Sequence, residues 1–136
     1  MVEENSDHFL IVKEIMKNSI KKSSDFKTIY DKKMSYATKN LVMYISKNSE
    51  TERNRLGISV SHKVGNSVVR HTLARRIREI FRENVNKLQK NVDIIVVLRV
   101  GSEKAEFFIL KEDFLNLCKK HRIIKEKDSF DKEDNN

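Results

Sequence analysis

Basic side chains recur at helical spacing in the middle of the chain, and together they could hold a phosphate backbone. They occupy positions i, i+4, i+7 and i+11, which share one helical face for about three turns: His71, Arg75, Arg78 and Arg82. A planar guanidinium can bind a phosphate through two hydrogen bonds and can stack on an exposed base. A solvated helix face with ion pairs such as Arg75–Glu79 would explain part of the pattern. The stripe nevertheless favours nucleic-acid binding, because like charges on one face repel unless an anion arrives.

The segment before this stripe could add a further phosphate contact. Residues 61–66 (Ser-His-Lys-Val-Gly-Asn) form a short polar connection in which glycine lets the backbone turn tightly. Asn66 or Ser67 is expected to open the helix, so Lys63 and the first-turn amides could hold one phosphate together. Arg70 belongs by its angle to the apolar face, but it lies at the helix start. We expect it to project from the end of the helix rather than into the core.

The charge of the whole chain is concentrated in this region. The formal net charge is +8 and the sequence pI is about 9.6. Ten basic and two acidic residues lie between Arg53 and Lys90, so this stretch alone carries an excess of eight. The remainder has 18 bases and 18 acids. Such a balance predicts an anionic partner, which could be a nucleic acid, a membrane surface or an acidic protein.

Length and composition indicate one intracellular domain. The chain has 136 residues, of which 38% are hydrophobic, enough for one modest core. Cys118 is the single cysteine, which excludes an intrachain disulfide and suits a reducing cytoplasm. No export signal or membrane span is visible, so we expect a cytoplasmic location. Residues 1–19 are expected to form a flexible arm, 20–122 the domain, and 123–136 a disordered charged tail.

The elements that must position the stripe follow from periodicity. Apolar residues at helical spacing predict helices at residues 22–31, 66–88 and 106–121. Strands are expected at 41–46, 55–61 and 92–99, with a short edge strand within 34–39. A strand, a long helix and a continuously apolar strand in this order indicate a βαβ unit. The sequence therefore predicts a two-layer α/β sandwich with about four mixed strands and three helices.

Alternation in the second of these strands separates two faces. Leu56, Ile58 and Val60 are expected to point inward. Three polar residues should then stand on the opposite, open face of the strand: Arg55, Ser59 and Ser61.

Protein-borne catalysis and a protein metal site are not expected. His62 and His71 have no partner at nucleophile–base or metal-ligand spacing. Four acidic residues likewise form no recognised metal-ligand motif: Asp25, Glu79, Glu83 and Asp93.

Several segments together resemble the protein subunit of bacterial ribonuclease P. Residues 63–70 (Lys-Val-Gly-Asn-Ser-Val-Val-Arg) are similar to the family's K-x-G-N-A-V-x-R, and residues 77–82 continue as Ile-Arg-Glu-Ile-Phe-Arg. Residues 21–30 look like the family's L-K-K-x-x-D-F-x-x-V-F opening, and residues 41–44 and 55–61 fall in order between them. The resemblance extends from about residue 19 to residue 120, and the joint pattern is specific.

The resemblance implies a fold, a partner and a reaction. The fold would be an α/β sandwich with a left-handed crossover between parallel strands. The protein would bind the catalytic RNA subunit and the 5′ leader of precursor tRNA in a ribonucleoprotein endoribonuclease, with cleavage and magnesium expected mainly in the RNA. No obligate protein partner is evident. Phe26 and Tyr30 match positions that line the family's leader-binding cleft, where aromatic faces can stack on bases, and Arg55, Ser59 and Ser61 could contribute to the same cleft.

The chain departs from the family pattern where the family often reads R-N-R-x-K-R. Here His71, Thr72 and Ala74 replace an asparagine, an arginine and a lysine. Arg76 and the arginines of the stripe could compensate. The expected RNA contacts are therefore Lys63, Asn66, Arg70, His71, Arg75, Arg76, Arg78 and Arg82.

Two other functions remain to be weighed at this point. A stand-alone RNA-binding or RNA-chaperone protein would share the basic stripe but would not explain the Phe26 and Tyr30 motif upstream. Binding to an anionic membrane is disfavoured, because the apolar face of the long helix is needed for the core.

Overall fold

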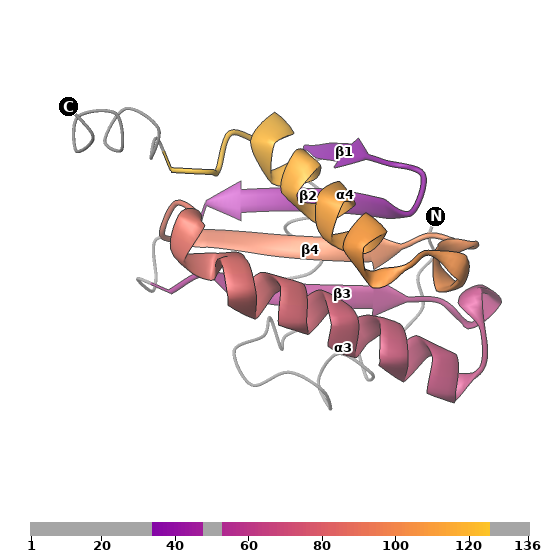
Figure 1. Cartoon of the computed structure of the whole chain (residues 1–136). Coiled ribbons are helices and arrows are strands. Elements are labelled where there is room, and N and C mark those ends of the chain that lie inside the picture. Colours follow the sequence, from indigo (N-terminus) through magenta and orange to yellow (C-terminus); the bar gives the residue numbers. More distant parts are fainter. Residues whose placement is uncertain (1–33, 48–52, 126–136) are drawn as a thin grey trace.

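The computed structural model describes residues 34–47 and 53–125 of the chain. The strands of these residues form one four-stranded sheet. Figure 1 shows this sheet as one layer, with helices α3 and α4, whose bounds follow, in front of it. In chain order the strands and long helices are β1 (Ser35–Ala37), β2 (Leu41–Lys47), β3 (Arg55–Val60), α3 (Ser67–Asn84), β4 (Val92–Leu98) and α4 (Phe107–Lys120). Short 3₁₀ turns lie between them, namely η1 (His62–Val64), η2 (Val85–Lys87) and η3 (Ser102–Lys104).

The sheet is mixed, as the sequence predicts. Its strand order is β1-β2-β4-β3. β1 pairs antiparallel with β2, and β2 pairs antiparallel with β4, whereas β3 and β4 run parallel with Arg55 opposite Asp93. Parallel neighbours need a crossover connection, and α3 supplies it. The βαβ unit expected around the basic stripe is therefore confirmed.

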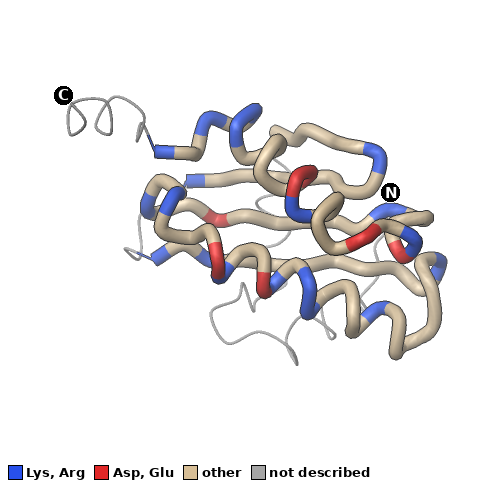
Figure 2. The backbone as a smooth tube through the Cα atoms, viewed as in Figure 1, with Lys and Arg blue, Asp and Glu red and all other residues tan. Residues whose placement is uncertain are grey.

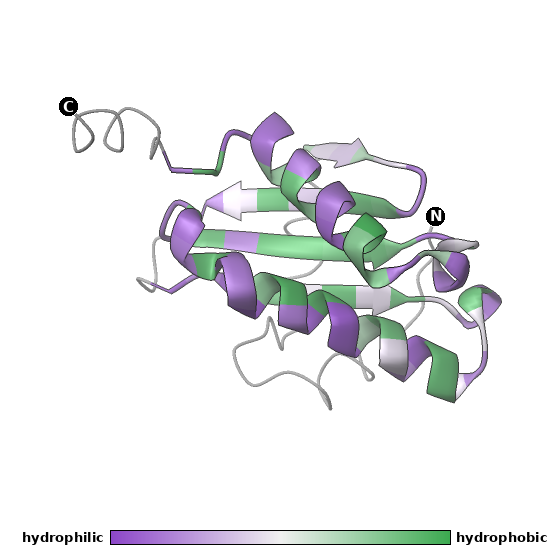
Figure 3. Ribbon diagram, viewed as in Figure 1, coloured by the Kyte–Doolittle hydropathy of each residue, from purple (hydrophilic) through white to green (hydrophobic). Residues whose placement is uncertain are grey.

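Both helices bury their apolar faces on one side of the sheet. α3 packs against β3, and α4 packs against β2. The fully buried side chains include Leu73, Ile77 and Ile80 of α3 and Phe114 of α4. Figure 3 shows green apolar and purple polar positions alternating along both helices. The amphipathic patterns thus fix which face of α3 is left for solvent.

Two predicted boundaries are wrong. α3 ends at Asn84, where the chain tightens into η2, rather than at Leu88. Ile123 is buried and does not begin a free tail, because its carbonyl accepts a hydrogen bond from the Gln89 amide and the Lys125 amide donates to the Lys87 carbonyl. The predicted helix at 22–31 and the arm at 1–19 lie outside the described residues.

Candidate nucleic-acid interface

The turn before α3 is held by its own side chains. The hydroxyl of Ser61 accepts a hydrogen bond from the Lys63 amide at 3.0 Å and caps η1. Asn66 caps α3, and its Oδ1 accepts from the Val69 amide at 2.9 Å. A Cβ on Gly65 would lie 2.8 Å from Val69 Cγ1, so only glycine fits here without displacing that side chain. Lys63 remains exposed beside a preorganised helix start.

Arg70 is buried, which corrects the expectation that it projects from the helix end. Only 7% of the residue is exposed. Its Nε lies 3.4 Å from the Asn66 carbonyl oxygen, and its Nη1 is buried with no hydrogen-bond partner in the described part of the chain. Arg70 is buried as its angular position on the helix indicates, because the first turn of α3 already packs against the rest of the domain. A guanidinium with an unused N–H can donate a hydrogen bond to an anion.

The outer face of α3 presents most of the predicted stripe. His71, Arg75 and Arg82 are exposed, whereas Arg76 and Arg78 are half-buried. His71 Nδ1 lies 2.8 Å from the Ser67 carbonyl, so the ring donates this hydrogen bond and directs Nε2 outward. No acidic residue occurs in the first turn of α3. The face can therefore bind anions along most of the helix.

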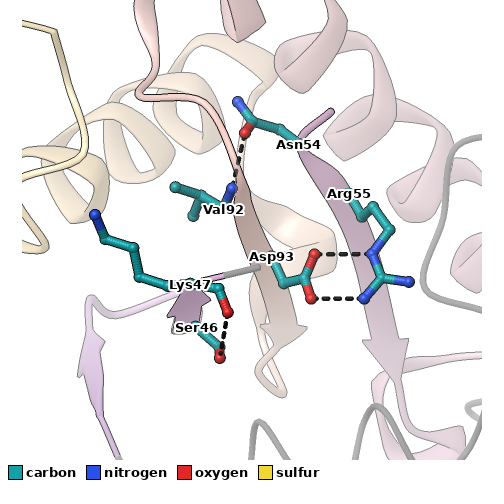
Figure 4. Close-up of polar contacts among 6 residues, drawn as sticks. All are labelled: Ser46, Lys47, Asn54, Arg55, Val92 and Asp93. Atoms are coloured by element: carbon teal, nitrogen blue, oxygen red, sulfur yellow. Dashed lines mark hydrogen bonds and ion pairs between the residues drawn. The ribbon is translucent and has the colours of Figure 1, made fainter. Parts of the chain in front are cut away.

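Arg55 takes part in an ion pair that the sequence did not reveal. Its Nε and Nη2 donate to Asp93 Oδ1 and Oδ2 at 2.9 and 2.7 Å, a two-point contact between β3 and β4 (Figure 4). The two side chains are 24% and 7% exposed. Nearby, Asn54 Oδ1 accepts from the Val92 amide at 2.9 Å, which fixes the same end of both strands. Arg55 thus has a structural partner within the sheet.

Ser59 does not stand on an open strand face, because the residue is only 2% exposed. All of β3 except Arg55 is buried, glycine included, so both faces of this strand are covered. Ser61 is half-buried, and its hydroxyl caps η1. Phe26 and Tyr30 lie outside the described residues, so their place in a leader cleft stays a prediction.

Within residues 34–47 and 53–125, no three His, Cys, Asp or Glu side chains gather as a metal site would require. Burial raises the pKa of the Cys118 thiol to about 12, so this thiol is not poised as a nucleophile. No helix among the described residues is long and apolar enough to cross a membrane.

Sequence reasoning missed a group of cations at the end of α4. Lys119, Lys120, Arg122 and Lys125 are all exposed. The net charge of the chain outside residues 53–90 is zero, because these cations are balanced by acidic residues elsewhere, including those of 126–136. The total therefore concealed the group. The run Lys-Lys-His-Arg at 119–122 was the available signal.

Comparison with known proteins points to one family. The family model described as Ribonuclease P matches residues 16–122. The ribonuclease P protein component of Lachnoclostridium phytofermentans is 46% identical over 109 residues, covering 80% of this chain and 93% of that protein. The protein from Clostridioides difficile is 40% identical over 105 residues, covering 76% and 91%.

Solved structures agree with the sequence comparisons. The RNase P protein of Staphylococcus aureus superposes with a TM-score of 0.74 at 34% identity, covering 81% of this chain and 100% of that one. The RNase P protein from Thermotoga maritima gives a TM-score of 0.69 at 31% identity, covering 76% and 97%.

Proposed function

The chain belongs to the ribonuclease P protein family, and from this premise we propose that the outer face of α3 binds the catalytic RNA subunit. The protein is a component of a ribonucleoprotein endoribonuclease that processes tRNA. Its partner is therefore RNA, and we no longer consider the alternative hypothesis of a stand-alone RNA-binding protein. What remains to be proposed is which residues meet which RNA.

The main observation in support of RNA binding by α3 is that this helix has one buried apolar face and one exposed basic face. Leu73, Ile77 and Ile80 are fully buried against the sheet, while Arg75 and Arg82 face solvent. The basic face is therefore not needed for folding, and it is long enough to follow an RNA backbone for several phosphates.

The start of α3 supports a phosphate contact in the same interface. Lys63 is exposed, Asn66 fixes the first turn, and the Nη1 of Arg70 is buried without a hydrogen-bond partner in the described residues. A phosphate oxygen near this end would fill the unused donor and be favoured by the helix dipole. We include His71, Arg76 and Arg78 in the interface, with Arg76 compensating for Thr72 and Ala74.

For precursor tRNA, we propose that Phe26 and Tyr30 stack on leader bases, as their family positions imply. Ser61 could join them from the end of β3. Because Ser59 is buried and Arg55 is bound to Asp93, any contribution from these two residues would require their surroundings to change.

Magnesium is proposed to act with the RNA partner, where it would stabilise charge at the scissile phosphate. Two acidic residues of the described chain suit it poorly, since Asp93 is held by Arg55 and Glu83 lies 3.7 Å from Lys111. We propose a cytoplasmic location, where tRNA precursors are made.

We also propose the left-handed crossover and the third helix at residues 22–31. The hand is supported by Figure 1, in which β3 and β4 point the same way and α3 returns in front of the sheet. Turned so that both strands point upward, β4 lies to the left of β3. That arrangement is the rare hand for such a connection.

Reconstitution tests the proposed function. The full chain is mixed with a bacterial ribonuclease P RNA at moderate salt and low magnesium, and 5′ cleavage of precursor tRNA is followed on a gel. We expect the protein to restore cleavage and Arg75→Ala/Arg82→Ala to weaken RNA binding, lowering the salt slope of log Kd by about two.

The matched control is Lys39→Ala/Lys104→Ala, which removes the same charge from exposed positions outside α3. If the two double variants bind RNA with equal affinity and equal salt slope, α3 is not the RNA-binding face. Failure of the wild-type protein to restore cleavage by an RNA known to be active would overturn the proposal as a whole.

A further inference from the structure

A second group of exposed cations lies where α3 and α4 both end. We call it the distal basic surface, and its members are Lys87, Lys90, Lys119, Lys120, Arg122 and Lys125. The Lys125 amide donates to the Lys87 carbonyl at 2.8 Å, and Leu88 forms a bridge with Ile124. These contacts bring the end of α4 against the connection between α3 and β4. Figure 2 shows the resulting blue segments at one end of the fold.

Within residues 34–47 and 53–125, local electrostatics does not account for this many cations. The carboxyl end of each helix carries about half a negative charge, so α3 and α4 together offer roughly −1 against six cations. Residues 84–92 and 114–125 contain no Asp or Glu. Among the described residues, the carboxylates nearest in sequence already have partners: Asp93 is bound to Arg55, Glu83 lies 3.7 Å from Lys111, and Asp113 accepts a hydrogen bond from Asn40.

Arg122 gives independent support, because glycine would suit its backbone better. Its φ is +60°, in the left-handed region. The Ile123 amide donates to the Cys118 carbonyl, and the Arg122 amide donates to that of Lys119, the pattern that ends helices at a glycine. An arginine held in this conformation is disfavoured by its Cβ. A long cation at a position that favours glycine indicates that the side chain has a use in solvent.

The distal basic surface is too far from the start of α3 to share its phosphate. The eighteen residues of α3 span roughly 25 Å at about 1.5 Å per residue. Screening at physiological salt acts over about 8 Å. An anion bound near Lys63 and Arg70 therefore does not reach the distal cations.

We propose that the distal basic surface binds the phosphate backbone of structured RNA as a second contact, separate from the start of α3. This inference rests on the proposed function, since it extends the RNA interface of the same protein. Two contacts about one α3 length apart would fix the orientation of the protein on its RNA. Lysine suits this role, because it acts as a point charge that needs no base identity.

Equilibrium binding of the full chain tests the proposal with two probes, a ribonuclease P RNA transcript and a precursor tRNA transcript. Kd is measured from 100 to 400 mM KCl for wild type, Lys87→Gln/Lys90→Gln and Lys39→Gln/Lys104→Gln. We expect the distal variant to bind one of the probes about three- to tenfold more weakly at 150 mM, with a salt slope lower by one to two. The probe that loses affinity identifies which RNA contacts this surface.

Arg122→Gly separates binding from folding. We expect its Tm to equal or exceed that of wild type, because glycine relieves the left-handed backbone, while its Kd rises about threefold and its salt slope falls by about one. The proposal is overturned if the distal variants match the Lys39/Lys104 control in Kd and slope for both probes. Arg75→Ala/Arg82→Ala is measured in parallel, so a failure of the α3 interface is recognised separately.

Discussion

Two arginines, one half-buried and one buried, lie in different regions of this domain and differ in what surrounds their guanidinium groups. Arg55, at the β3–β4 pair, donates two hydrogen bonds to Asp93. Arg70, at the start of α3, has its Nε 3.4 Å from the Asn66 carbonyl and a buried Nη1 with no hydrogen-bond partner in the described residues. Both are mostly removed from water, at 24% exposure of the Arg55 side chain and 7% of the Arg70 residue.

The difference separates a structural cation from a binding cation. A half-buried charge with a two-point carboxylate partner links two strands through charge-assisted hydrogen bonds. A buried charge with an open donor reduces stability until an anion arrives. The folded domain therefore gains from Arg55, and the complex with RNA should gain from Arg70.

The largest effect is expected for Asp93→Ala. This change leaves the Arg55 guanidinium without its carboxylate, and we expect the free energy of unfolding to fall by about 3 kcal/mol. Urea denaturation followed by circular dichroism measures it. Glu79→Ala is the control, since it removes an exposed acid and should change stability by less than about 0.5 kcal/mol. Equal stability of the two variants would make the Arg55–Asp93 pair dispensable.

Arg70→Met should show the reverse pattern. Removing a cation with an unfilled donor should leave the free energy of unfolding unchanged or slightly higher. Loss of a charge-assisted phosphate contact should weaken RNA binding about tenfold to a hundredfold. Parallel urea denaturation and RNA titration measure both quantities. A variant that loses stability as Asp93→Ala does, and binds RNA normally, would place Arg70 with the structural cations.

The sequence predicted the fold well because periodic burial decides it. The apolar positions of α3 and the continuously apolar β4 were enough to identify the βαβ unit and the mixed sheet. The basic stripe was also readable, since its spacing places Arg75 and Arg82 away from the buried face.

What the sequence could not show depends on contacts between distant residues. The partner of Arg55 is Asp93, 38 positions away, and only the parallel register brings the two opposite each other. The orientation of Arg70 could not be predicted, because a residue in the first turn of a helix can point into the core or away from the helix end. Packing of α3 on the domain decides between the two. Ile123 joined the core because residues 123–125 pair with the connection after α3, a contact that no local pattern announces.

Lysine substitutions separate the effect of charge from that of hydrogen-bond geometry, because lysine keeps the positive charge but lacks the planar guanidinium group. Arg55→Lys should lower the free energy of unfolding by about 1 kcal/mol, since one of its two hydrogen bonds to Asp93 is lost. Arg70→Lys should keep wild-type stability and weaken RNA binding severalfold. The same denaturation and titration experiments apply. If both variants lose stability and neither loses affinity, the two arginines have the same role.

The smallest effect on stability is expected for His121, a third side chain that can carry a positive charge while partly buried. Its Nε2 lies 2.9 Å from the Met43 carbonyl oxygen, and its ring contacts the edge of Tyr36. Burial lowers the pKa of His121 below the ordinary 6.5, and the hydrogen bond to Met43 opposes this only in part. A neutral carbonyl thus supports the charged form less well than the carboxylate of Asp93 supports Arg55.

The sign of the resulting pH dependence follows from the lowered pKa. As pH falls through 6.5, the unfolded chain takes up a proton at His121 before the folded one does, so stability is lost on acidification and is fully present above that pH. We expect urea midpoints measured at pH 7.5 and 5.5 to fall further for wild type than for His121→Gln, which can still donate to Met43 and does not titrate. The opposite result would be a wild-type protein that gains stability relative to His121→Gln at pH 5.5. It would show that the Met43 carbonyl stabilises the imidazolium more than burial destabilises it. A neutral acceptor would then be sufficient to stabilise a buried cation.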